Sequence, residues 1–96
     1  MTKQQIIRIL RQYKNDFSEE YGITRMGVFG SVARNDANPD SDIDVFVDMM
    51  KPDLFTIAGI KSDLEAKLNC PVDIVQYGKH MNTFLKNRID KDGVYV

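Results

Sequence analysis

Residues that bind metal ions through nitrogen or sulfur are scarce in this sequence. Its 96 residues include no tryptophan, one cysteine (Cys70) and one histidine (His80). One cysteine excludes an internal disulfide, and metal sites of the Cys/His type need several such ligands. The sequence therefore predicts neither a Cys/His metal site nor a histidine-based catalytic group, and Cys70 is expected to be a small core residue. This cysteine content fits a reducing compartment.

Long apolar runs and an excess of positive charge are also missing. No apolar stretch is long enough to span a bilayer, and the polar first fourteen residues lack the apolar core of a signal peptide. The 13 Lys and Arg residues against 14 Asp and Glu residues give a formal net charge of −1. Strong binding to nucleic acid depends on Lys and Arg that neutralise phosphates. We therefore expect a cytoplasmic protein that binds no membrane and does not bind nucleic acid strongly.

Hydrophobic periodicity predicts a single α/β (α+β) domain over residues 1–96. With 43% apolar and 28% charged residues, a chain of this length can bury a core of its own. Apolar residues recur at helical spacing in some segments and alternate as in strands in others. Helices are expected between Thr2 and Gly22, over 31–36, between Asp53 and Asn69 and over 80–88, and strands over 23–29, 43–49, 72–75 and 94–96.

Two of these helices have apolar residues that we expect to lie against the core. In the helix after Asp53, the expected buried face comprises Leu54, Ile57, Ile60 (or Ala58), Leu64 and Leu68. In the last helix, the expected buried residues are Met81, Phe84 and Leu85.

The stretch from residue 30 to residue 44, GSVARNDANPDSDID, combines two features of phosphate chemistry. Gly30 and Ser31 follow an expected strand, where a turn offers backbone N–H groups to a phosphate. Asp42 and Asp44 begin the next strand and point to the same face, because strand side chains alternate. Two carboxylates so close repel each other, and a Mg²⁺ ion, which prefers oxygen ligands, would relieve that repulsion. The pattern predicts nucleotide chemistry, whereas the glycine-rich signatures of P-loop and dinucleotide-binding proteins are absent.

Two further residues have two interpretations each. Arg34, in the expected short helix, can bind a phosphate or pair with a nearby aspartate. Asp73 interrupts the apolar run VDIV, where it either faces solvent from a half-exposed strand or takes part in the site. The residues alone leave both choices open.

The Gly-Ser pair, the ten-residue gap and the Asp-x-Asp pair together resemble the signature of the polymerase-beta-type nucleotidyltransferase superfamily. The flanking residues 33–34 (Ala-Arg) and 41–44 (Ser-Asp-Ile-Asp) strengthen the resemblance, which covers nearly the whole chain. The short chain resembles the minimal nucleotidyltransferases that are paired, as antitoxins, with HEPN-domain toxins. A lone Asp-x-Asp pair would mean little, so the joint motif carries the resemblance.

This resemblance implies a nucleotidyltransferase fold, a small mixed β-sheet of three to four strands flanked by helices. It implies that the catalytic and metal-binding residues are Asp42, Asp44 and Asp73, holding two Mg²⁺ ions. It assigns nucleotide binding to Gly30, Ser31 and Arg34. The implied activity is transfer of AMP from ATP to a tyrosine of a HEPN toxin, which makes the protein an antitoxin enzyme.

Other functions are alternatives to this one. The protein could neutralise its partner by binding alone, or transfer a nucleotide to a small molecule or to an RNA end. The acidic balance argues against RNA. The lack of a second substrate-binding domain argues against a small molecule such as an antibiotic. Replacing Asp42 and Asp44 by asparagine distinguishes the enzyme from the binding protein, because only the enzyme needs the carboxylates.

Overall fold

A four-stranded sheet forms the centre of the computed structural model, which describes residues 1–36 and 42–96. The strand order is β3–β2–β1–β4. β1 pairs antiparallel with β2 and β4, whereas β2 and β3 are parallel, so the sheet is mixed as expected. The strands are β1 (Ile23–Phe29), β2 (Ile43–Met49), β3 (Val72–Gln76) and β4 (Val94–Tyr95).

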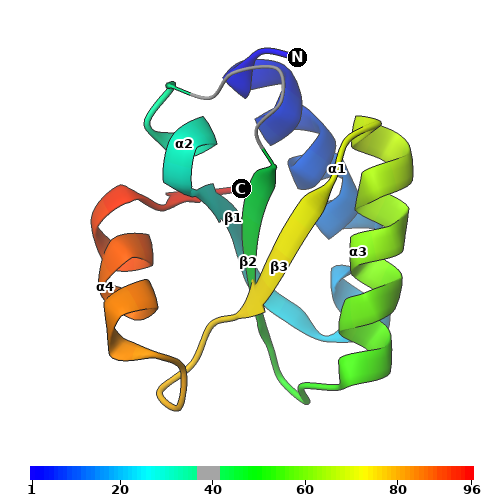
Figure 1. Ribbon diagram of the computed structural model, residues 1–96. Coiled ribbons are helices and arrows are strands. Elements are labelled where there is room, and N and C mark those ends of the chain that lie inside the picture. The colour runs from blue at the N-terminus through cyan, green and yellow to red at the C-terminus, as the bar shows by residue number, and fades with distance from the viewer. Residues whose placement is uncertain (37–41) are drawn as a thin grey trace.

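Helices pack on both faces of this sheet (Figure 1). They are α1 (Lys3–Tyr21), α2 (Gly30–Ala33), α3 (Leu54–Leu68) and α4 (Thr83–Asp92). The long helices α1 and α3 lie on one face, where the Tyr13 hydroxyl of α1 donates a 2.8 Å hydrogen bond to Asp63 of α3. α4 lies on the opposite face, and α2 follows the end of β1. No helix of the described residues is long and apolar enough to cross a membrane.

Alternating side chains of β2 serve two separate hydrophobic clusters. Val45 and Val47 belong to the larger cluster, together with residues of α1 and α3 such as Leu10 and Leu64. Phe46 points to the other face, where it packs with Phe29 of β1 and Ile89 of α4. Burial of apolar surface on both faces fixes the register, because a slip of one residue would exchange the faces. It also fixes which side chains of β2 can reach the α4 side.

The helix ends of α1 and α3 lie where the sequence predicted them. Thr2 and Gln5 form a capping box at the start of α1, and Gly22 ends that helix with φ of 67°. Asp53 caps α3 by accepting a hydrogen bond from the Phe55 N–H, and Asn69 ends it with φ of 55°. Local side-chain chemistry is sufficient at these four ends.

The two remaining helices differ from the expected bounds. α2 spans Gly30–Ala33 and is shorter than the expected 31–36. α4 spans Thr83–Asp92 instead of 80–88, because the Asn82 side chain accepts a hydrogen bond from the Leu85 N–H and starts the helix there. Residues 37–41, which include Asp40 of the expected turn-rich loop, lie outside the described residues.

The prediction of a buried position is wrong for two residues. Leu54 is 82% exposed and Phe84 is 72% exposed. Each lies in the first turn of its helix, and packing against the sheet begins only further along. The expected core residues Ile60, Leu64 and Leu68 are buried.

Candidate active site

Asp44 and Asp73 lie side by side on adjacent strands. Asp44 is the second residue of β2 and Asp73 the second residue of β3, and the parallel register pairs them directly. Paired residues of neighbouring strands point to the same face, which here is the face of Phe46 and α4. Asp42 stands immediately before β2. Asp42 and Asp73 are exposed and Asp44 is half-buried, so this edge of the sheet is acidic and open.

The electrostatics of Asp44 show that charged groups converge here. Burial raises the pKa of the Asp44 carboxyl above its ordinary value, and the negative charges of Asp73 and Asp42 raise it further. Arg88 and Arg34 oppose this shift in the pKa. Burial disfavours an ionised carboxylate, and so do neighbouring carboxylates. A bound cation would remove this penalty.

Gly30 brings the start of α2 against Asp44. Phe29, the last residue of β1, pairs with Asp44 of β2, and Gly30 follows with a positive φ of 72°. A β-carbon at position 30 would collide with the Asp44 carboxylate. Only glycine satisfies both the positive φ and this close approach. Gly30 and Asp44, one residue from each half of the sequence motif, therefore lie at one place.

Arg34 forms ion pairs in this structure. Its Nε lies 3.3 Å from Oδ2 of Asp36, and its Nη1 lies 3.7 Å from Oδ2 of Asp92 in α4. Its side chain is 41% exposed. The pair with Asp92 links α2 to the last turn of α4.

The carboxylates alone supply only part of the ligand set that a hard divalent cation such as Mg²⁺ needs. In the described ranges, 1–36 and 42–96, no group of three or more His, Cys, Asp or Glu residues is placed to hold a metal ion. Mg²⁺ usually takes one or two protein carboxylates and completes its six ligands with waters and substrate phosphates. The paired Asp44 and Asp73, with Asp42 beside them, supply the oxygen donors that such a site needs.

Sequence analysis missed Arg88, which adds positive charge at this edge. Arg88 is half-buried and precedes Ile89, the residue that anchors α4 to the sheet. Its position could be recognised only from helical spacing, since Arg88 follows Leu85 by three residues and Leu85 packs in the same cluster.

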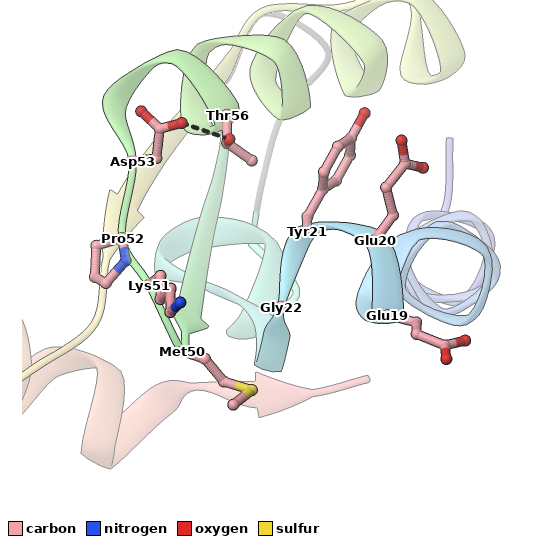
Figure 2. A pocket seen from close by; sticks show the side chains of 9 residues that line it. All are labelled: Glu19, Glu20, Tyr21, Gly22, Met50, Lys51, Pro52, Asp53 and Thr56. Carbon is pink, nitrogen blue, oxygen red and sulfur yellow. Dashed lines mark hydrogen bonds between the residues drawn. The ribbon is translucent and has the colours of Figure 1, made fainter.

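One pocket of the described residues lies elsewhere (Figure 2). It is formed by the end of α1 and the segment between β2 and α3, and its lining includes Glu19, Glu20 and Asp53. The Thr56 hydroxyl donates a 2.9 Å hydrogen bond to Asp53 there. This pocket is at the far end of β2 from Asp44, and no residue of the sequence motif lines it. We therefore do not assign the nucleotide to it.

Comparison with known proteins gives a consistent result. Residues 10–96 match the nucleotidyltransferase domain family. Protein adenylyltransferase MntA from Thermococcus cleftensis is 37% identical over 92 residues, which cover 95% of this chain and 88% of that protein. A solved structure described as a minimal nucleotidyltransferase is similar with a TM-score of 0.79 and 30% identity, over 98% of this chain and 95% of that one.

Solved toxin–antitoxin structures share the fold at lower identity. One contains tri-AMPylated Shewanella oneidensis HEPN toxin in complex with MNT antitoxin; its matching chain has a TM-score of 0.74 and 19% identity, over 98% of this chain and 71% of that one. Another is a toxin–antitoxin structure with AMP-PNP. Its matching chain has a TM-score of 0.73 and 22% identity, over 99% of this chain and 72% of that one. At this identity, the likeness establishes the common fold.

Proposed function

Because this chain belongs to the nucleotidyltransferase domain family, we propose that it transfers AMP from ATP to a hydroxyl of a partner protein. The observation that carries the proposal is the meeting of Gly30, Asp44 and Asp73 at one edge of the sheet. This edge combines a backbone turn with carboxylates, which are the two parts that a triphosphate and its metal ion require. The likeness to a protein adenylyltransferase supports ATP as the nucleotide and a protein as the acceptor.

Each residue of the site has a proposed role. Asp42, Asp44 and Asp73 would hold Mg²⁺ as two ions, with the phosphates of ATP completing the ligand set. The ions would supply charge stabilisation at the attacking and leaving oxygens. The backbone of Gly30 and Ser31, with the Ser31 hydroxyl, would steady the triphosphate. Arg34 would have to leave Asp36 and Asp92 in order to contact a phosphate.

The reaction is an in-line displacement at the α-phosphorus of ATP. The acceptor hydroxyl oxygen forms a bond to the α-phosphorus, and the bond from that phosphorus to the oxygen bridging to the β-phosphate breaks. Pyrophosphate leaves with the bonding electron pair. Besides its place in the metal site, the Asp73 carboxylate would accept the proton of the acceptor hydroxyl. Positioning and electrostatics supply most of the acceleration in such a reaction, so a few side chains suffice.

The proposed acceptor is a tyrosine of a HEPN-domain toxin, and the protein acts in the cytoplasm as its antitoxin. The fold is shared with an MNT antitoxin whose HEPN toxin partner is AMPylated. The open site agrees with a protein acceptor, because Asp42 and Asp73 are exposed and a partner surface would cover them.

The experiment uses ATP labelled at the α-phosphate, with Mg²⁺ and an extract of the host. We expect one discrete labelled protein band on a denaturing gel, lost with chelator and with Asp42→Asn/Asp44→Asn. The matched control is Glu19→Gln/Glu20→Gln, which also removes two exposed acidic charges, but at the far pocket; it should label normally. Label on RNA or on a small molecule would overturn the protein acceptor, and no transfer at all would overturn the enzyme.

A further inference from the structure

Packing of α4 places Arg88 on the same side of the sheet as the acidic edge. Ile89, the next residue, is 1% exposed and packs with Phe46 of β2 and Phe29 of β1. Phe46 stands two residues after Asp44 on the same face of β2. Because Ile89 fixes the rotation of α4, the position of Arg88 beside this face is set by the core.

A second contact orients the same face of α4 toward α2. Asp92 lies 3.7 Å from Arg34 at the end of α2. Arg88 precedes Asp92 by one helical turn, and residues four apart lie on one face of a helix. In agreement with this placement, the positive charge of Arg88 opposes the rise in the pKa of the Asp44 carboxyl, and it does so more strongly than the charge of Arg34. Arg88 therefore faces the region between α2 and the start of β2.

Arg88 differs from Arg34 in its partners. Within residues 1–36 and 42–96, no carboxylate lies within 4.0 Å of the Arg88 guanidinium, whereas Arg34 has two such partners. Arg88 is also half-buried. Charged groups that are withdrawn from water are usually paired. A planar guanidinium that pairs with no carboxylate of the described residues, beside a site for phosphates, suits bidentate contact with phosphate oxygens.

We infer that Arg88 binds the β- and γ-phosphates of the nucleotide and so holds the pyrophosphate part of the substrate at this edge. The inference rests on the proposed function, since it names a substrate contact of the same site. A triphosphate adds negative charge to an edge that already has three aspartates, and Arg88 offsets part of it. The same contact would stabilise pyrophosphate as negative charge develops on it.

The test compares the binding of AMP-PNP and AMP, with Mg²⁺, by titration calorimetry. AMP lacks the two phosphates that Arg88 is inferred to contact. For Arg88→Met we expect the affinity for AMP-PNP to fall about tenfold or more, because a charge-assisted hydrogen bond contributes about that factor. The affinity for AMP should be nearly unchanged. The matched control is Lys91→Met, which removes an exposed positive charge from the same helix and should bind both as the wild type does.

The outcomes separate the inference from the proposed function. Wild-type protein that binds neither nucleotide would overturn the proposed function and the inference with it. If the wild type binds the nucleotides and Arg88→Met prefers AMP-PNP over AMP as strongly as the wild type does, the inference alone is overturned. An equal loss for AMP-PNP and AMP would mean that Arg88 only supports the structure. If Arg88→Met does not fold, Arg88→Lys replaces it, and a partial loss specific to AMP-PNP is expected because lysine keeps the charge without the planar fork.

Discussion

Gly30 brings the backbone so close to the acidic edge that a β-carbon there would meet the Asp44 carboxylate. We expect Gly30→Ala to lower both AMP transfer and stability, because its β-carbon would meet the Asp44 carboxylate and because φ there is 72°. A left-handed conformation costs a residue with a β-carbon about 1–2 kcal/mol, and displacement of Asp44 adds to this. Thermal unfolding measures the loss of stability, and the labelled-ATP assay measures the loss of transfer.

Gly59 provides the matched control for that substitution. It lies inside α3, and a β-carbon there would meet nothing within 4 Å. We expect Gly59→Ala to be neutral or more stable by about 0.5–1 kcal/mol, since alanine is the better helix former, and to transfer AMP normally. If Gly30→Ala behaved like Gly59→Ala in both assays, the close approach of Gly30 to Asp44 would have no functional importance.

The carboxyl of Asp44 makes the free protein less stable as the pH rises. Its pKa is raised in the folded state by burial and by Asp73. The folded protein therefore holds this proton more tightly than the unfolded chain, and stability falls as the pH rises from the unfolded pKa through the folded one. We expect Asp44→Asn to unfold at a higher temperature than the wild type at pH 7 without metal ions, while losing transfer.

Asp48 provides the control for Asp44→Asn, because it lies on the same face of the same strand but has a partner. Its Oδ2 lies 2.6 Å from Nη2 of Arg25. Asp48→Asn should leave stability unchanged or lower it by up to about 1 kcal/mol, as for other exposed ion pairs. Thermal unfolding with chelator at several pH values from 4 to 8 gives the measurement. An Asp44→Asn variant that is less stable than the wild type at pH 7 would show that its carboxylate stabilises the free fold.

At the level of elements, the β1–α2–β2 unit could be predicted from sequence because its determinants are local. Strand alternation alone places Asp42 and Asp44 on one face, and Gly30 marks the turn that returns to them. The ends of α1 and α3 follow from capping side chains such as Thr2 and Asp53. These features depend on neighbours within a few residues.

The features that could not be predicted depend on packing between distant elements. The exposure of Phe84 follows from where Ile89 meets Phe46 of β2. The proximity of Arg88 to Asp44 follows from the same contact, and the Arg34–Asp92 pair joins helices that are far apart in sequence. Likewise, Leu54 fits the apolar periodicity of α3 and is still exposed, because periodicity does not tell how far the sheet extends beneath a helix.

At the scale of the molecule, the described residues leave the acidic edge open to solvent. Asp42 and Asp73 are exposed, and the pocket formed by α1 and the β2–α3 segment is at the other end of β2. Water competes with an acceptor hydroxyl in an open site, and enzymes suppress that competition by closing the site around the substrate. The described residues leave Asp42 and Asp73 exposed, so we expect the partner protein to supply such a closure.

This dependence on a partner leads to a test in growing cells that separates catalysis from binding. If AMP transfer disarms the partner, co-expression of wild-type protein should restore the growth of cells that make the cognate HEPN toxin, whereas Asp42→Asn/Asp44→Asn should not. Co-purification of the variant with the toxin is the control, because it shows that the complex still forms without the two carboxylates. The Glu19→Gln/Glu20→Gln control should protect growth fully. Full protection by Asp42→Asn/Asp44→Asn would mean that the protein neutralises its partner by binding, and that the acidic edge serves another purpose.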